Sequence, residues 1–198
     1  MKPYDQFQLN IQRVENLQGV YSSLSGTITS AIDLSDILRA EIVLLLSALD
    51  YYIHSKVLSK VEDTFTGKAA STIKFESTSV RISTVKQALA SGTSVQWLLD
   101  EIYHQHSWRS FQTPDNIADA LKMVSQRKVW ESVSKNLGAP VQDVKNNLRV
   151  LVERRNKIAH EADSDPSLPT AKLPITDVDV QIAIEFIKSI VAEIEIII

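Results

Sequence analysis

Hydrophobic side chains recur every three or four residues along most of the chain, a spacing that places them on one face of an α-helix. The first such run, residues 7–24, predicts an N-terminal helix that ends at Gly26. A second helix begins near Asp33 or Ser35, either of which can cap it, and contains the apolar stretch Ile42–Leu49. Because that stretch is apolar on almost every side, we expect this helix at the centre of the fold.

The middle of the chain contains one ambiguous stretch and several shorter helices. Apolar positions partly alternate in residues 64–83, which favours a short hairpin, but a loop with one helical turn fits them equally well. Residues 94–106 have helical spacing. Thr113 followed by Pro114 is a strong helix start, because the hydroxyl can cap and proline suits the first helical position. Residues 129–137 predict another helix, closed by a Gly-Ala-Pro break.

The rest of the chain predicts two further helices and one loop. One helix runs from Val141 toward His160, and Thr176 caps the last one. Residues 162–174 contain three of the six prolines and are expected to form a surface loop. With no internal repeat or linker, the 198 residues predict a single all-α domain, a bundle of four to five main helices. That domain has two parts: the N-terminal helix, residues 1–26, and the core bundle, residues 34–195.

Composition narrows the classes of function. The chain has no cysteine, which excludes disulfide scaffolds, cysteine-ligated metals and cysteine nucleophiles. No signal-peptide core follows the N-terminus, the stretch Ile42–Leu49 is too short to cross a bilayer, and charges interrupt the run Ile182–Ile198. We therefore expect a cytoplasmic protein that does not enter membranes, and no motif requires a metal or another cofactor.

Charge is distributed unevenly along the chain. The formal net charge of −3 argues against nucleic-acid binding, since phosphate contacts need an excess of Lys and Arg. Between Lys145 and His160, however, five cations accompany a single acid, Glu153, so this segment carries +4 and the remainder −7. Within it an arginine, an amide and an imidazole stand together: Arg155, Asn156 and His160.

These three side chains are the groups needed to cleave RNA without a metal. A histidine, whose pKa is ordinarily about 6.5, can move the proton of a 2′-hydroxyl or of the leaving 5′-oxygen. An arginine offers forked donors to the charged, phosphorane-like transition state. An asparagine can hydrogen-bond the phosphate or hold the histidine in one tautomer. The residues alone do not select RNA over other phosphates.

The spacing of the motif restricts how a site can form. Arg155 and His160 are five residues apart, so an ideal helix separates them by about 140° of rotation and about 7.5 Å of rise. Either the helix unwinds near His160, or two copies of the chain assemble the site about a two-fold axis. A plainer explanation stays open, because cations near a helix C-terminus complement the helix dipole without any catalytic role.

The segment Arg155–His160 resembles the signature of HEPN domains, in which an arginine and a polar residue precede a histidine at the end of a late core helix. Three other segments resemble the RiboL-PSP-HEPN subgroup: the apolar helix Arg39–Ile53, the segment Ser110–Ile117 and the helix that contains Trp130. The resemblance covers residues 34–195. Glu161 departs from it, since many relatives have glycine after the histidine.

The resemblance implies a HEPN-type helical bundle that acts as a metal-independent endoribonuclease and a homodimer, often as a toxin or antiviral effector. The family chemistry leaves a 2′,3′-cyclic phosphate and a 5′-hydroxyl. By position, Arg155 and His160 would be the catalytic pair and Asn156 the supporting polar residue. RNA would be the substrate, and an antitoxin or other regulatory protein a partner. Two other classes stay open: a non-catalytic HEPN dimer that binds RNA or nucleotide or serves as a partner module, and a structural helical adaptor.

Three further residues are candidates to support the site. Arg154 and Lys157 are cations of the same helix. Asp50 is an acid in the most apolar helix, where a buried carboxylate needs a partner. One hypothesis is that Asp50 contacts a motif arginine or the His160 region and orients the site. An exposed position, near the lysines further along that helix, is equally consistent with the sequence.

The histidines and tryptophans outside the motif are expected to be structural. His104 and His106 alternate on a helix end with no third metal ligand in evidence, and His54 lies in the central helix. Aromatic side chains are mostly buried, so Trp97, Trp108 and Trp130 are expected in core or dimer contacts rather than as platforms for RNA.

Overall fold

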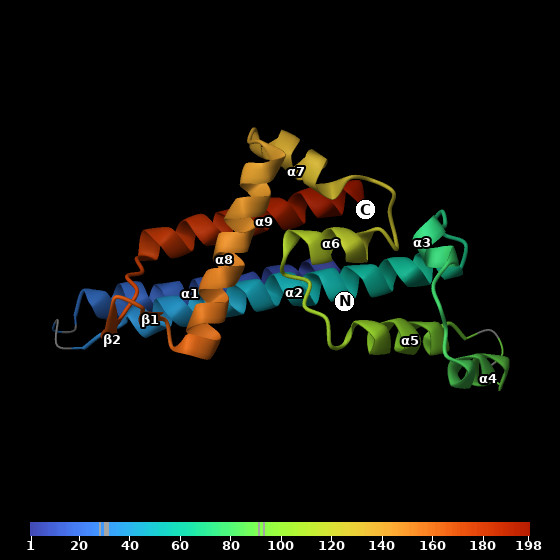
Figure 1. Ribbon diagram of the computed structural model, residues 1–198, viewed down its shortest axis with the longest axis horizontal. Helices are drawn as coiled ribbons and strands as arrows, with labels where there is room; N and C mark the ends of the chain where they lie inside the picture. Colours follow the sequence, from blue (N-terminus) through green and yellow to red (C-terminus); the bar gives the residue numbers. More distant parts are fainter. Residues whose placement is uncertain (28, 30–31, 91, 93) are drawn as a thin grey trace.

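The computed structural model describes residues 1–27, 29, 32–90, 92 and 94–198. Within these residues the chain forms nine helices and one two-stranded sheet, which confirms the predicted all-α class (Figure 1). The elements are α1 Pro3–Ser25, α2 Ser35–Phe65, α3 Ile73–Glu76, α4 Ile82–Ala90, α5 Gln96–His106, α6 Pro114–Leu121, α7 Val129–Leu137, α8 Val141–Glu161, β1 Ser164–Asp165, β2 Leu168–Lys172 and α9 Asp177–Ile197.

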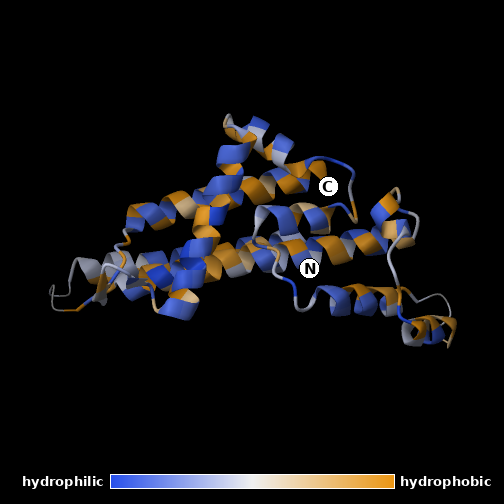
Figure 2. Ribbon diagram, in the orientation of Figure 1, coloured by the Kyte–Doolittle hydropathy of each residue, from blue (hydrophilic) through white to orange (hydrophobic). Residues whose placement is uncertain are grey.

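Helix α2 is the centre of the fold, as its apolar sequence predicts. It contacts α1, α5, α6, α8 and α9, and α1 lies along much of its length (Figure 1). Side chains such as Leu45, Leu49 and Ile53 are fully buried between these helices. Burying each one stabilises the fold by roughly 1.5–3 kcal/mol relative to leaving it exposed. Figure 2 shows hydrophobic and hydrophilic residues alternating along α8 and α9, so each of these helices turns one apolar side to the core.

Local capping signals set several of the helix ends, although α1, α2, α5, α7 and α8 begin without a side-chain cap hydrogen bond. The Thr113 hydroxyl accepts the Asn116 N–H at the start of α6. At the start of α9, Thr176 and Asp179 form a reciprocal capping box. Gly138 ends α7 in a left-handed conformation, with φ at 62°, which glycine adopts without a steric cost.

The structure decides between the alternatives for residues 64–83 and revises one predicted loop. The hairpin is wrong: the chain forms the alternative loop with a helical turn, α3, and α4 follows it. Alternation is misleading here because it does not reflect burial, since Ile73 and Ile82 are 84% and 77% exposed. The segment 162–174, predicted to be a loop, contains the short antiparallel pair β1–β2.

The length of α2 also changes the argument about membranes. An 18-residue window of α2, longer than the stretch Ile42–Leu49, is apolar enough for a helix that crosses a bilayer, judged by length and composition alone. Half of its most apolar window is buried inside the protein, and the polar residues Arg39, Glu41 and Lys56 are buried along it. A core helix of a bundle has these properties, so the absence of membrane insertion stays a prediction that rests on packing rather than on length.

Candidate functional site

The motif residues lie on the last turns of α8, which stays helical through Glu161. The alternative in which the helix unwinds near His160 is therefore wrong. An uninterrupted helix turns Arg155 and His160 about 140° apart around its axis. Within one chain the two side chains consequently leave α8 on different sides.

The guanidinium of Arg155 has few partners. Its Nη1 donates to Asn156 Oδ1 at 2.9 Å. Its Nε is buried and, among the described residues, has no hydrogen-bond partner. A guanidinium carries five N–H donors, and, apart from the one given to Asn156, the Nη1 and Nη2 donors of Arg155 have no partner among the described residues. An arginine in this condition is suited to a bidentate contact with a phosphate.

His160 is exposed, and none of the hydrogen bonds, ion pairs or ring contacts in the described part of the chain involves its side chain. Lys157, one turn earlier, is half-buried, and its ammonium group likewise has no acid partner there. The main chain of Lys157 has a capping role, because its carbonyl accepts the N–H groups of Ala162 and Asp163. The end of α8 thus presents a free imidazole and two free cations, one of them on Arg155.

Arg154 has an environment opposite to that of its neighbour. Its Nη2 pairs with Asp163 Oδ2 at 2.6 Å and donates to the carbonyls of Leu173 and Pro174 at 3.1 Å. From α2, Arg39 donates to the same carboxylate oxygen at 2.7 Å and to the Leu173 carbonyl at 2.7 Å. We refer to Arg39, Arg154 and Asp163 as the Asp163 cluster. It fastens the hairpin that follows α8 onto the first turns of α2.

Asp163 is fully buried in a strained part of the backbone. Its φ is 56° and that of Ala162 is 51°, both in the left-handed region. For residues other than glycine this conformation costs on the order of 1 kcal/mol or more each. The two arginine contacts offset this strain, since charge-assisted hydrogen bonds are the strong ones in proteins.

Sequence reasoning missed Asp163 and Arg39. No periodic pattern marks a loop residue, and these two are 124 positions apart. One local signal was available, because an acid two residues beyond a helix C-terminus is unfavourable beside the helix dipole. An acid in that position indicates a cationic partner from elsewhere in the chain.

Within the described part of one chain, the polar partners of Asp50 lie outside the motif, so the hypothesis that it orients the site gains no support from these contacts. Its Oδ1 accepts the Phe111 N–H at 2.5 Å and lies 3.8 Å from Nε2 of His54. The same His54 nitrogen is 3.2 Å from the Arg109 carbonyl oxygen. Asp50 therefore projects toward the connection between α5 and α6 and holds that loop, which explains how a carboxylate is accommodated in so apolar a helix.

The other histidines have structural surroundings, as predicted. His106 is buried with its ring edge-on to Phe111, and burial, reinforced by the charge of Arg109, lowers its pKa to about 4. His104 makes a similar contact with the exposed Trp108, at 5.0 Å between ring centroids. Among the residues that the structure describes, no group of three His, Cys, Asp or Glu side chains could hold a metal ion.

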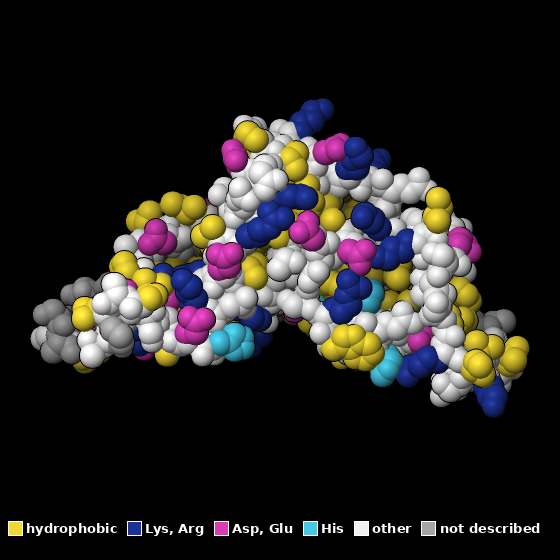
Figure 3. Space-filling view, viewed as in Figure 1, with side chains coloured by type: hydrophobic (Ala, Val, Ile, Leu, Met, Phe, Trp, Pro, Cys, Tyr) yellow, Lys and Arg dark blue, Asp and Glu magenta, His cyan; other side chains and the backbone are white. Residues whose placement is uncertain are grey.

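The remaining cations of α8 are paired. Lys145 and Arg149 approach the Asp115 carboxylate of α6 at 3.6 and 3.2 Å, and the hydrogen bond from Arg149 is the main cause of a lowered Asp115 pKa. Figure 3 shows Lys and Arg side chains gathered over α8, with acids among them. The free donors therefore lie at the motif end of the helix rather than along the whole basic segment.

An all-α bundle whose late core helix ends in a largely unpaired arginine and an exposed histidine has the arrangement of a HEPN domain. The chain belongs to the RiboL-PSP-HEPN family, whose model matches residues 9–198. Membership indicates a nucleotide-related function and, in coarse terms, an enzyme, since HEPN domains are often ribonucleases. Neither a curated protein nor a solved structure matches the chain.

Proposed function

We propose that this protein is a metal-independent endoribonuclease of the HEPN type. The observation that carries the proposal is the state of the motif: Arg155 keeps most of its donors free, and His160 is exposed, at the end of a helix whose other arginines are paired. Leaving strong donors unpaired gives a fold no stability, but it suits a site that binds an anion. Because HEPN domains are often ribonucleases, family membership supports an RNA phosphate as that anion.

The proposed reaction requires two proton transfers and stabilisation of charge on phosphorus. The ribose 2′-oxygen bonds to phosphorus while an imidazole takes its proton. The bond from phosphorus to the 5′-oxygen breaks while that oxygen receives a proton from an acid. Arg155 donates to the non-bridging oxygens, on which negative charge increases. The products are a 2′,3′-cyclic phosphate and a 5′-hydroxyl, with no change in oxidation state.

A homodimer supplies what one chain lacks. A single helix turns Arg155 and His160 to different sides, whereas a two-fold axis near the end of α8 brings two copies of each to one cleft. One histidine then acts as base and its symmetry mate as acid. We include the dimer in the proposal for this reason.

A ribonuclease of this kind would be harmful when unregulated, which fits a cytoplasmic toxin or antiviral effector held in check by an antitoxin or another regulatory protein. The charge of the chain supports this part of the proposal. Outside the +4 segment the protein carries −7, so a basic partner could dock without covering the motif.

The test is cleavage of structured and unstructured RNA by purified protein in EDTA. We expect cleavage with cyclic-phosphate ends, and a loss of about 100-fold or more in Arg155→Ala and in His160→Ala. Arg149→Ala and His104→Ala are matched controls, because they remove a paired, partly exposed arginine of the same helix and an exposed histidine outside the motif. Both should retain activity.

Three results would contradict the proposal in different ways. Loss of cleavage on chelation would exclude a metal-free mechanism. Activity in both motif variants would remove these residues from the mechanism. RNA binding without cleavage, together with harmless expression in growing cells, would favour the non-catalytic HEPN module.

A further inference from the structure

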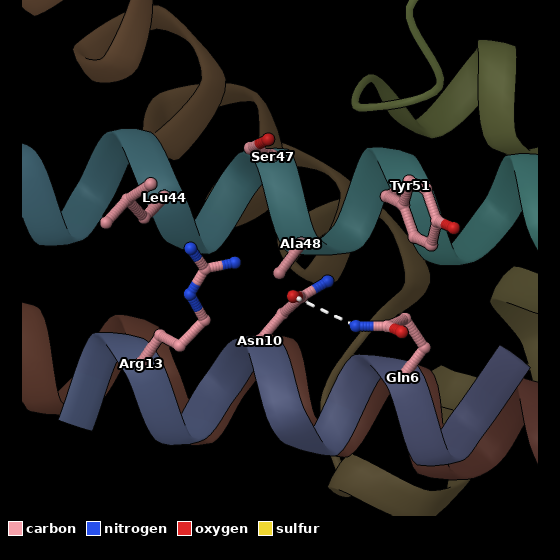
Figure 4. A pocket seen from close by; sticks show the side chains of 7 residues that line it. All are labelled: Gln6, Asn10, Arg13, Leu44, Ser47, Ala48 and Tyr51. Atoms are coloured by element: carbon pink, nitrogen blue, oxygen red, sulfur yellow. Dashed lines mark hydrogen bonds between the residues drawn. The ribbon is translucent and has the colours of Figure 1, made fainter. Parts of the chain in front are cut away.

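A groove of about 400 Å³ lies between α1 and α2, away from the motif (Figure 4). The two helices run antiparallel here, since Arg13 lies beside Leu44 at one end and Gln6 beside Tyr51 at the other. Ala48 forms part of the floor. The groove is therefore bordered by polar groups from α1 and by small or aromatic side chains from α2.

The polar groups of the groove are largely unsatisfied. Arg13 is exposed and makes no ion pair or hydrogen bond with the residues that the structure describes. Gln6 Nε2 donates weakly to Asn10 Oδ1 at 3.4 Å, which leaves the Gln6 carbonyl and the Asn10 amide group available. Ser47 and Tyr51 contribute hydroxyl groups without partners in the same described residues. These groups face solvent and are accessible to a ligand.

The groove continues along α2 into a second hollow of about 340 Å³. Ser47 and Tyr51 line both hollows, and the second extends to Leu58 and to Tyr103 of α5. From Leu44 to Leu58 the helix rises about 21 Å. Tyr51 and Tyr103 are 54% and 61% exposed, an unusual degree of exposure for large aromatic rings. The combined surface is long and open, which suits an extended chain better than a compact small molecule.

We propose that this groove binds single-stranded RNA as a substrate subsite, an inference that rests on the proposed ribonuclease function. The guanidinium of Arg13 offers donors to a backbone phosphate. The rings of Tyr51 and Tyr103 offer faces on which bases stack. The amides of Gln6 and Asn10 can hydrogen-bond base edges, because an amide both donates and accepts. Among the described residues, the surface has one free cation, Arg13, and the Asp50 carboxylate lines its second hollow, so it would contribute base contacts more than electrostatic attraction.

The Asp163 cluster relates the groove to the motif. Arg39 of α2 holds the residue that follows the motif helix, and Leu44 is five residues further along α2, about 7.5 Å of rise. Arg39 and Leu44 point to different sides of α2, so a bound strand must curve around this helix to reach the motif. Single-stranded RNA is flexible enough to do so, whereas a duplex is not. The subsite should therefore favour unpaired substrates.

The test is binding of a fluorescent single-stranded oligonucleotide in which every ribose carries a 2′-O-methyl group. Such a strand has no 2′-hydroxyl nucleophile and cannot be cleaved by the proposed chemistry. We expect Arg13→Ala and Tyr51→Ala each to weaken binding about 5- to 50-fold. Tyr51→Phe keeps the stacking face and should bind within about two-fold of the wild type. A duplex of the same sequence should bind less tightly and be insensitive to Tyr51→Ala.

The matched control is Arg127→Ala, which removes another exposed arginine without an ion pair among the described residues, outside the groove. It should change binding less than two-fold. Equal losses in Arg13→Ala and Arg127→Ala would overturn the proposal, since they would reflect net charge alone. Unchanged binding in the groove variants would also overturn it. A changed oligomeric state in those variants, with RNA binding intact, would make the groove a protein interface instead.

Two readouts separate this proposal from the ribonuclease proposal. If the groove is a subsite, Arg13→Ala raises KM for single-stranded RNA, whereas Arg155→Ala lowers kcat and still binds the methylated strand. Failure of cleavage in the wild type, with groove-dependent binding retained, would refute the enzyme but not the binding site. Cleavage that is lost in Arg155→Ala but unchanged in the groove variants would support the enzyme and refute the binding site.

Discussion

Two neighbouring regions at the end of α8 differ in whether their charged side chains have partners. In the Asp163 cluster, two arginines converge on one fully buried carboxylate, and the Nη2 group of each also donates to the Leu173 carbonyl. One residue away, the hydrogen-bond partner of Arg155 among the described residues is the Asn156 side chain, and His160 is exposed. The first region is held by several charge-assisted hydrogen bonds, although Asp163 Oδ1 and Arg154 Nε have no partner among the described residues, whereas the second region has a single hydrogen bond.

This difference assigns the two regions different roles. Buried charges that are mutually satisfied fix the geometry of a fold, because removing one partner leaves the other uncompensated. Exposed charges without partners contribute little to stability and are available to a ligand. The cluster thus holds the end of α8 in place, and the motif residues beside it are free to act.

The largest effect is expected from breaking the cluster. Within the described residues, Asp163→Ala leaves the buried Arg39 with only the longer ion pair to the exposed Asp36 carboxylate, at 3.4 Å, and we expect the free energy of unfolding to fall by about 3–5 kcal/mol, measured with urea. Asp165→Ala, in the same hairpin but without an arginine partner, is the control and should move the urea midpoint little. Similar midpoints for the two variants would show that the cluster does not hold the fold.

The second prediction compares the neighbouring arginines. Arg155→Ala should lower kcat/KM by about 100- to 1000-fold and leave the urea midpoint unchanged. Arg154→Ala should lower the free energy of unfolding by about 2–4 kcal/mol, while the protein that stays folded keeps activity within about ten-fold. Arg155→Lys should not restore activity, since an ammonium lacks the planar fork. Loss of activity without loss of stability in Arg154→Ala would reverse the two roles.

Glu41 belongs to neither region, because its side chain is buried and yet has no partner among the described residues. Neither carboxylate oxygen has a hydrogen-bond partner among the described residues, and burial raises its pKa from 4.5 to about 7. The folded chain therefore binds a proton at Glu41 more readily than the unfolded chain does. The stability that this proton provides is complete below pH 4.5 and is lost as the pH rises through 7.

Glu41→Gln should remove this dependence on pH. Wild type and variant should be equally stable near pH 4, and by pH 8 the variant should be more stable by up to about 3 kcal/mol. The measurement is urea unfolding of both proteins from pH 4 to 8. The lowered pKa of His106 acts in the same way in both proteins, so the difference isolates Glu41. Parallel curves would show that Glu41 has a partner in solution.

The fold was predictable where signals are local. The bounds of α7 follow from the sequence because a left-handed glycine ends it, and the start of α9 follows from the capping box of Thr176. The sequence pattern predicted no helix at α4, whose apolar residues Val85 and Leu89 are 43% and 83% exposed. Periodicity predicts burial, and this helix does not bury its apolar side within one chain.

The site was predictable only as a motif. The buried stripe of Val144, Leu148 and Val152 runs into Arg155, which accounts for the buried Nε of that arginine. This apolar pattern does not predict that the β1–β2 segment packs against Arg154, because that contact joins residues that only the tertiary structure brings together. The same holds for Asp50, whose partner Phe111 is 61 residues away.

The smallest effect concerns Asn156, which accepts the hydrogen bond from Arg155 Nη1. Because this pair is exposed, Asn156→Ala should lower kcat/KM only about three- to ten-fold, by loosening the guanidinium. Asn146 provides a matched control, since it accepts from Arg149 Nη1 in the same way on the same helix, outside the motif. Asn146→Ala should leave cleavage unchanged, and equal effects of the two variants would remove Asn156 from the site.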